Sequence, residues 1–209
     1  MSSSALKEQT RTEQSQKGGA KVGDLVTPNW RQSAKSIQKY GTVVQDLPIG
    51  LEAKAREEVV GRLNLLLADT ITLRDLYKKS HWQVGGPTFY QLHLLFDKHA
   101  GEQSELVDEI AERIQILGGV SIAMAHDVAA NARIERVPID REEVPVQISR
   151  LLEAHHVILK DARDLAEKAN DLGDVGTNDL LASSVVRTNE MQVWFVSEHL
   201  VEMPLVIAK

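Results

Sequence analysis

Apolar residues recur at intervals of three and four along most of the chain after residue 50, as on one face of an α-helix. Glycine- and proline-containing breaks divide this pattern into four long predicted helices: Leu51 to Val84, Thr88 to Leu117, Val144 to Leu172, and Thr177 to just before Pro204. One short helix is expected within 121–132, in the connection between the second and third. The pattern therefore predicts an all-α four-helix bundle with a short extra helix in its middle connection.

The first part of the chain lacks this pattern and carries the opposite charge. Residues 1–40 hold seven Lys/Arg and three acidic residues, a net charge of +4 that leaves −10 for the rest of a chain of net charge −6. This part is rich in Ser, Gln, Thr and Gly, so we expect a mostly flexible tail, although Trp30 and Tyr40 suggest that its second half docks onto protein. The chain then divides into a basic N-terminal tail (1–50), the bundle (51–203) and a short apolar tail (204–209).

The composition narrows the function classes. Because the chain has no cysteine, disulfides and thiolate metal sites are excluded, and a metal site must be built from His, Asp and Glu. No apolar run is long enough for a signal peptide or a membrane span. We expect a cytoplasmic protein without a membrane partner, associated with the nucleoid if it binds DNA.

Candidate metal ligands lie on the second predicted helix. His93 and Asp97 are four residues apart, as are Asp108 and Glu112, and all four fall on one side of the helix. The midpoints of the two pairs are fifteen residues apart, or about 22 Å along a helix. The two pairs cannot therefore hold the same ion within one chain.

A two-fold axis would bring the pairs together, because an antiparallel copy of the helix places one pair opposite the other. Small residues on the same side, at Ala100, Gly101 and Ser104, would let two helices approach closely. His81, at the end of the first helix, can fold back across the Gly-Gly-Pro turn. The sequence thus predicts two equivalent sites per dimer, each with His81, His93 and Asp97 from one subunit and Asp108 and Glu112 from its partner.

Imidazoles and carboxylates suit iron, while zinc or manganese without redox chemistry stays an alternative. Each residue taken alone is also compatible with helix surface or packing.

These motifs resemble the Dps family, the ferritin-like DNA-binding proteins from starved cells. The matching stretches are HW at 81–82, LH at 92–93, FD at 96–97 and DEIAERIQILGG at 108–119, within a resemblance that covers 51–203. The resemblance implies a hollow shell of twelve subunits built from two-fold dimers. It also implies a di-iron ferroxidase site shared between subunits, which oxidises Fe(II) with hydrogen peroxide or oxygen and deposits Fe(III) mineral in the shell, protecting DNA from oxidative damage.

The resemblance extends to residues outside the ligand set. Trp82, beside His81, resembles the family's tryptophan, which is thought to donate an electron or quench a radical; packing against the dimer partner is the alternative. Asp179 and Asp174 resemble the aspartates that line the pores through which iron enters. An acid near Thr177 would also complement the dipole of the fourth helix.

The residues also allow one other function and one other place for an iron site. Lys7, Arg11, Lys17 and Lys21 are candidate phosphate contacts, so an architectural protein that condenses DNA through its N-terminal tails, with only structural metal, is the alternative function. An iron site inside one bundle is poorly supported, because the chain offers one Glu-x-x-His turn, at 153–156, and no second. His155 is interpreted as a core or interface histidine, and no role is assigned to the remaining histidines: His99, His126, His156 and His199.

Overall fold

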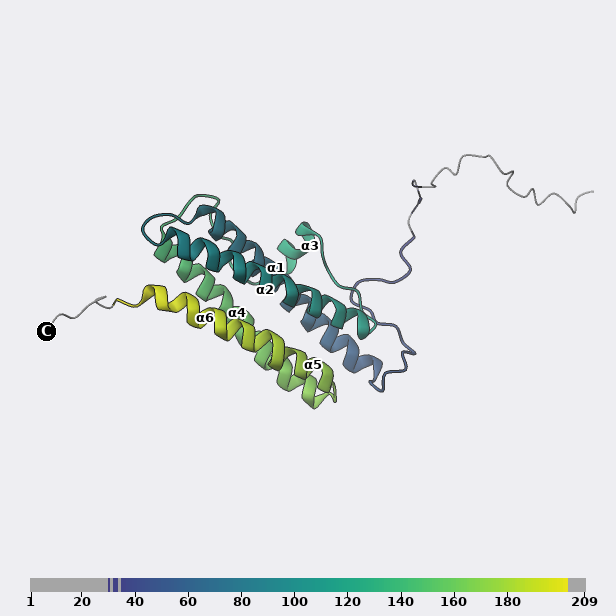
Figure 1. The fold of residues 1–209 in the computed structure, drawn as a ribbon. Helices are drawn as coiled ribbons and strands as arrows, with labels where there is room; N and C mark the ends of the chain where they lie inside the picture. Colours follow the sequence, from purple (N-terminus) through teal and green to yellow (C-terminus); the bar gives the residue numbers. More distant parts are fainter. Residues whose placement is uncertain (1–29, 31, 34, 203–209) are drawn as a thin grey trace, which may run out of the picture. The chain divides into compact units, whose positions relative to one another are not determined.

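The helices follow the sequence pattern closely. The computed structural model describes residues 30, 32–33 and 35–202, and all of the regular secondary structure in these residues is helical (Figure 1). The first three long helices are α1 (Ala53–Gln83), α2 (Phe89–Ile116) and α4 (Val144–Asp171), and the short α3 (Ala125–Asn131) lies in the connection between α2 and α4. The fourth long stretch comprises α5 (Val175–Asp179), the π-helical segment η1 (Leu180–Val186), α6 (Arg187–Ser197) and the short 3₁₀ turn η2 (Glu198–Leu200).

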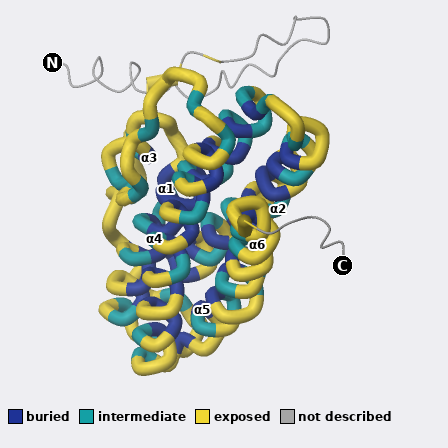
Figure 2. The backbone as a smooth tube through the Cα atoms, turned by 90° about the vertical axis from the view of Figure 1, so that its left-hand side faces the viewer, coloured by how far each residue is buried: buried dark blue, intermediate teal, exposed yellow. Residues whose placement is uncertain are grey.

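The long helices form one bundle. α1 packs against α2 and α4, and α4 packs against α5, η1 and α6, while α3 lies on α1. Figure 2 shows the buried residues gathered on the sides of the helices that face one another. The predicted four-helix bundle with one short extra helix is thus confirmed. Within the described residues, no helix has the length and apolar character needed to cross a membrane.

The turn between α1 and α2 determines which residues meet at that end of the bundle. After the last turn of α1, the backbone N–H of Val84 donates to the carbonyl of Ser80 at 2.8 Å. Gly86 then adopts a φ of +91°, in the left-handed region that only glycine enters at little cost, and its carbonyl accepts from the N–H of Phe89 at 3.0 Å. The chain reverses within five residues, so the end of α1 lies beside the start of α2.

The fourth stretch departs from the prediction in two ways. It begins at Val175 rather than at Thr177, and its N-cap is Asp174, whose carboxylate accepts from the N–H of Thr177 at 2.9 Å. From Leu180 to Val186 the helix is π-helical, with a wider turn than the regular helix that the sequence pattern predicts. The predicted end of this helix, before Pro204, lies outside the described residues.

Residues that precede the first helix pack against the bundle. Residues 37–50, the last part of the expected flexible tail, belong to the same compact unit as the helices. Val44 donates its N–H to the carbonyl of Gly118 at 2.9 Å. The buried guanidinium of Arg56 donates to four carbonyls at this end of the bundle, those of Val44, Gln45, Leu51 and Leu117. Within residues 1–40, the side chain of Gln38 donates to the carbonyl of Gly118 at 2.9 Å and the Tyr40 side chain is exposed. Docking of the tail's second half as a whole stays a prediction.

The basic residues Lys7, Arg11, Lys17 and Lys21 and the apolar C-terminal segment 204–209 lie outside the described residues.

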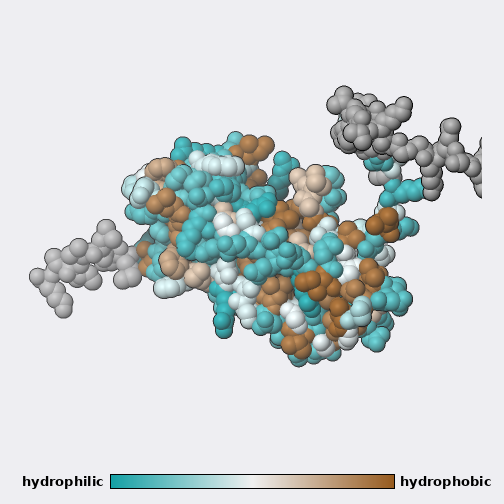
Figure 3. Space-filling model, turned by 45° about the vertical axis from the view of Figure 1, so that its right-hand side comes forward, coloured by the Kyte–Doolittle hydropathy of each residue, from teal (hydrophilic) through white to brown (hydrophobic). Residues whose placement is uncertain are grey.

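Apolar side chains reach the surface of the helical unit in patches (Figure 3). Exposed large apolar side chains on the bundle include residues of α1, α2 and α6: Trp82, Phe89, Tyr90, Leu94, Trp194 and Phe195. Five aromatic side chains on these helices of the single subunit are therefore in contact with solvent.

Candidate metal centre

The structure brings His81 and His93 together across the Gly-Gly-Pro turn. His81 lies in the last turn of α1 and His93 in the second turn of α2. Their imidazole rings stack, with centroids 3.8 Å apart and an angle of 22° between the planes. Both residues are partly buried, and Phe89 covers His93 with its ring centroid 5.0 Å away.

Each of these histidines is held by the main chain of the other. Nδ1 of His81 lies 2.7 Å from the carbonyl oxygen of His93, and Nδ1 of His93 lies 2.9 Å from that of His81. A carbonyl oxygen only accepts hydrogen bonds, so Nδ1 carries the hydrogen in both rings. In a neutral imidazole the lone pair is then on Nε2, the atom that binds a metal ion. Both rings are therefore set in the tautomer that a metal ligand needs.

Asp97 adds a carboxylate beside the two imidazoles. Its Oδ1 lies 4.0 Å from Nε2 of His81 and 2.6 Å from Nζ of Lys78. The hydrogen bond from Lys78 holds the pKa of Asp97 below its ordinary value, so this carboxylate is ionised at neutral pH. The ammonium group of Lys78 is thus hydrogen-bonded to Oδ1 of Asp97, an oxygen that a metal ion would need.

Asp108 and Glu112 lie at the other end of α2, as the sequence spacing requires. Both are exposed, and the exposed Gly101 and Ser104 lie between them and Asp97. The pairs remain about 22 Å apart along the helix. Within the described residues of one chain, no group of three or more His, Asp or Glu side chains is arranged to hold a metal ion.

One residue assigned to this exposed side was placed wrongly. Ala100 was expected beside Gly101 and Ser104 at the contact with a second helix, but it is buried in the core of its own bundle. Of the three small residues expected at such a contact, Gly101 and Ser104 are exposed.

Trp82 points away from the core of its own subunit. Its side chain is 72% exposed, although its neighbour His81 is partly buried. A large apolar side chain in this position is available to a second subunit and lies next to a candidate ligand.

The two aspartates assigned to the pore have different surroundings. Asp174 is buried, forms an ion pair with Arg113 and caps α5 through Thr177, whose hydroxyl donates to Oδ2 at 2.6 Å. Asp179 is exposed and accepts a hydrogen bond from Ser183 at 2.9 Å. In the subunit, only Asp179 offers its carboxylate to solvent, while the charge and hydrogen-bonding capacity of Asp174 are used to start the fourth helical stretch.

The centre of the bundle contains a buried polar network that the sequence analysis does not predict. The Tyr77 hydroxyl lies 2.6 Å from Nε2 of His155, and Nδ1 of His155 lies 2.8 Å from Oδ1 of Asn189. Gln103 donates to the same oxygen at 3.2 Å and to Gln192 at 3.0 Å. The interpretation of His155 as a core histidine is confirmed. The sequence signal that could have revealed this network is that these polar residues recur at the same helical spacing as the apolar residues of the buried face.

The other residues that could form an iron site inside one bundle are not arranged for it. Glu153 and His156, the one Glu-x-x-His turn, are both exposed on α4 rather than directed into the core. His99 is buried, and its Nδ1 has no hydrogen-bond partner among the described residues. Burial lowers the pKa of His99 to about 4, so this histidine is neutral at pH 7.

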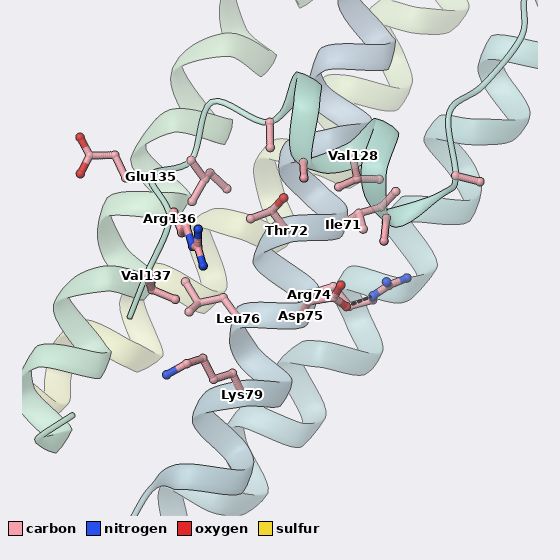
Figure 4. A pocket seen from close by; sticks show the side chains of 15 residues that line it. Ile71, Thr72, Arg74, Asp75, Leu76, Lys79, Val128, Glu135, Arg136 and Val137 are labelled. Atoms are coloured by element: carbon pink, nitrogen blue, oxygen red, sulfur yellow. Dashed lines mark hydrogen bonds and ion pairs between the residues drawn. The ribbon is translucent and has the colours of Figure 1, made fainter. Parts of the chain in front are cut away.

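A groove on another face of the bundle lies between α1, α3 and the segment that follows α3 (Figure 4). Apolar side chains such as Leu76, Val128 and Val137 line it, and Asp75 in its wall is bound by Arg74 at 2.8 Å. The groove contains none of the candidate metal ligands.

The sequence and the fold are similar to those of known proteins. Residues 60–206 match the ferritin-like domain family, Ferritin. The solved structure of DpsC from Streptomyces coelicolor is 55% identical and covers 83% of this chain and 100% of its own, with a TM-score of 0.81. The Dps protein from Vibrio cholerae, described as a member of a superfamily of ferritin-like diiron-carboxylate proteins, is 26% identical, covers 77% of this chain and 99% of its own, and has a TM-score of 0.71. A "DNA protection during starvation protein" from Halobacterium salinarum is 31% identical over 67% of this chain and 77% of its own length.

Proposed function

The chain belongs to the Dps family of ferritin-like proteins, and on this basis we propose that it oxidises Fe(II) with hydrogen peroxide or oxygen and stores the Fe(III) that forms. The observation that carries the proposal is the His81–His93 pair, in which two main-chain hydrogen bonds leave both Nε2 atoms free to bind a metal ion. The ionised carboxylate of Asp97 lies beside them.

The site is shared between two subunits related by a two-fold axis. One subunit supplies His81, His93 and Asp97, and the partner subunit's Asp108 and Glu112 complete the set. The 22 Å between the two halves on one α2 helix supports this arrangement, because an antiparallel copy brings complementary halves together twice. Two imidazoles and three carboxylates match the ligand preferences of iron, and nothing soft is present that would favour copper or structural zinc.

In the reaction, two Fe(II) ions give one electron each to hydrogen peroxide, which takes up two protons and leaves as two molecules of water. Supplying both electrons at one site prevents the release of hydroxyl radical. The role of the protein is to bind the Fe(II) ions and to orient the side chains that hold them. The carbonyl bonds fix the imidazoles, and the bound ion replaces the ammonium group of Lys78 at Asp97.

Iron supply and storage involve the assembled protein. We assign twelve subunits in a hollow shell, and the exposed aromatic side chains of the single subunit support burial between copies. The exposed Asp179 is assigned to the pores through which iron enters, and the net charge of −6 favours cations near the shell. Trp82 is assigned as an electron donor or radical trap beside His81.

Protection of DNA is the second part of the proposal. The basic residues Lys7, Arg11, Lys17 and Lys21, together with the names of relatives such as the DNA protection during starvation protein of Halobacterium salinarum, support DNA binding through the N-terminal tails. An architectural DNA-binding protein with only structural metal is the alternative to the iron-oxidising one.

The iron reaction is tested by adding Fe(II) to the purified protein without oxygen, then supplying hydrogen peroxide or oxygen and following Fe(III) absorbance and sedimentation. Fast oxidation, with iron that sediments together with a large assembly, supports the proposal. Asp97→Asn and Glu112→Gln should each abolish it, while Glu109→Gln, an exposed acid on the same helix, should not. Oxidation no faster than in buffer, or oxidation that survives both changes, would contradict the assignment.

The DNA-binding part is tested separately by deleting residues 1–29. The full chain should retard DNA in a gel at low salt and lose this ability as salt is raised, because the contacts are to phosphate. The shortened chain should not retard DNA at any salt concentration. Equal retardation by both chains would exclude the tails as the binding element.

A further inference from the structure

The centre of the bundle holds a tyrosine and a histidine that the proposed iron chemistry does not use. The Tyr77 hydroxyl on α1 lies 2.6 Å from Nε2 of His155 on α4, and both side chains are fully buried. The pair is enclosed by other rings, with Phe96 and His99 at centroid distances of 6.0 and 5.2 Å from Tyr77.

The direction of the hydrogen bond follows from the surrounding network. The amide nitrogen of Asn189 donates to the carbonyl of Val185, in the π-helical segment η1, at 2.7 Å. Oδ1 of Asn189 therefore faces His155 and accepts from Nδ1–H at 2.8 Å. With its hydrogen on Nδ1, His155 presents the lone pair of Nε2, and the Tyr77 hydroxyl donates to it.

The electrostatics of the site oppose ionisation of the phenol but not its oxidation. Burial raises the pKa of Tyr77 well above its ordinary value, so a phenolate does not form. Burial lowers the pKa of His155 to about 4, so the imidazole is neutral at pH 7 and its lone pair is free. A phenol that loses an electron becomes a strong acid. Transfer of its proton along this bond then leaves a neutral phenoxyl radical, which avoids a buried charge on the tyrosine.

The tyrosine is also close to the candidate iron site. Tyr77 precedes His81 by four residues on α1, one turn or about 6 Å along the helix. Phe96, whose ring packs near that of Tyr77, directly precedes Asp97. We propose that Tyr77 is a buried one-electron donor to the peroxide reaction at the shared iron site, and that His155 takes up its proton. This inference rests on the proposed iron-oxidising function.

The donor matters when a site holds one Fe(II) rather than two. Reduction of hydrogen peroxide to two molecules of water needs two electrons and two protons, and one Fe(II) supplies one electron. Tyr77 supplies the other: its O–H bond breaks, the proton moves to Nε2 of His155, and solvent provides the two protons that the peroxide takes up as its O–O bond breaks. The products are Fe(III), two waters, a neutral Tyr77 radical and a protonated His155. A later electron from Fe(II) and return of the proton restore the pair.

The burial of Tyr77 distinguishes it from the exposed aromatic residues near the site. In the single subunit Trp82 is 72% exposed and Tyr90 is 70% exposed, so enclosure of a radical on either depends on neighbouring copies. A radical on Tyr77 is enclosed by the bundle. The chain contains three tyrosines, and the other two, Tyr40 and Tyr90, are exposed and provide matched controls.

The proposal is tested by mixing the assembled protein with less Fe(II) than its sites require and an excess of hydrogen peroxide, then freezing and recording the EPR spectrum. We expect a tyrosyl radical, identified by the change in its hyperfine pattern when ring-deuterated tyrosine is incorporated. Tyr77→Phe, which removes only the hydroxyl, should lose the signal, whereas Tyr40→Phe and Tyr90→Phe should keep it. A signal that survives in Tyr77→Phe overturns the proposal.

The role of His155 as proton acceptor has its own measurements. His155→Gln keeps an oxygen that accepts the phenol's hydrogen bond but is too weak a base to take the proton, so the radical yield should fall although Tyr77 is present. In the unaltered protein, labelling histidine with ¹⁵N should reveal coupling between the radical and an imidazole nitrogen, which does not depend on the folding of any variant. Absence of that coupling overturns the Tyr77–His155 pair.

The same samples distinguish failure of this proposal from failure of the proposed function. Fe(III) absorbance reports iron oxidation independently of the radical. Protein that oxidises iron but forms no radical on Tyr77 overturns this inference alone. Protein that oxidises iron no faster than buffer overturns both.

Discussion

The stacked histidines are oriented by main-chain carbonyls rather than by carboxylates. Each ring is fixed by the other residue's backbone, at 2.7 and 2.9 Å, so its orientation depends on the α1–α2 turn and not on a bound ion. A ligand whose tautomer and position are set by the fold loses little conformational freedom when the metal binds. Metal binding at these two residues should therefore need little rearrangement within the subunit.

Lys78 competes with a metal ion for Asp97. Its ammonium group lies 2.6 Å from the carboxylate and must leave when a cation binds. We expect Lys78→Gln to lower the Zn(II) concentration at half-saturation by roughly a few-fold, the size expected for an exposed ion pair. Zinc is a suitable probe because it does not oxidise. Lys79→Gln is the control, since Lys79 is bound to Gln83 instead; an equal effect in both variants would show that only the general charge matters.

The sequence predicts that His81, His93 and Asp97 lie close together, but it does not predict what surrounds them. The four-residue spacings on α2 and the Gly-Gly-Pro turn are sufficient to place His81 near His93 and Asp97. The Lys78 contact is not predictable, because a lysine near a helix end resembles any solvated surface residue. Ala100 was placed wrongly because it lies at the border between the buried and exposed sides of α2, where an angle of about 100° per residue does not decide the side.

Buried neutral histidines make the stability of the bundle depend on pH. The folded pKa of His155 is about 4, below the ordinary value of 6.5, so between these values the unfolded chain binds a proton that the folded chain does not. Stability should fall as pH decreases from 6.5 to about 4, by at most about 1.4 kcal/mol per pH unit for each such histidine, and level off below. His155→Gln should weaken this dependence in guanidinium unfolding at fixed protein concentration. An unchanged slope would mean that His155 is already protonated in the fold.

At the scale of elements, the fourth helical stretch differs most from its prediction. The apolar residues Leu180, Leu181 and Val185 have ordinary helical spacing, so nothing in the sequence marks the π-helical turn that contains them. The expected N-cap, Thr177, lies three residues after the observed one, Asp174, because threonine is also a common capping residue. Asp174 becomes the N-cap because its carboxylate is held in place by a tertiary contact, the ion pair with Arg113 on α2. Sequence-local signals do not contain this information.

The two aspartates of this region should therefore respond differently to substitution. Asp174→Ala removes a buried carboxylate that binds Arg113 and Thr177, and we expect a loss of about 2–4 kcal/mol in the free energy of unfolding. Asp179→Asn changes an exposed group, so it should leave stability within about 0.5 kcal/mol but slow iron uptake by the assembled protein. Thermal unfolding and stopped-flow iron uptake give the two readouts. Normal uptake by Asp179→Asn would remove this residue from the pore assignment.

At the scale of the whole molecule, the proposed assignment gives one subunit two incomplete halves of a metal site at opposite ends of α2. The halves lie too far apart to meet in one chain, so metal binding and association of subunits should stabilise each other. The bundle itself was predictable, because apolar periodicity and the position of glycine and proline determine helices of this length. The packing of residues 37–50 through Arg56 was not, since an arginine that binds four carbonyls leaves no trace in the hydropathy pattern.

The shared site is tested most directly by complementation between two inactive variants. Subunits with His81→Ala and subunits with Glu112→Ala, carrying different tags, are co-expressed, and assemblies containing both are purified. In a mixed dimer one site combines both defects and the other has neither, so iron oxidation should return to about a quarter of the wild-type rate after random pairing. Mixing His81→Ala with Asp97→Ala, which affect the same half, should restore nothing. Failure of the first mixture to recover, or equal recovery in both, would contradict a site divided between two subunits.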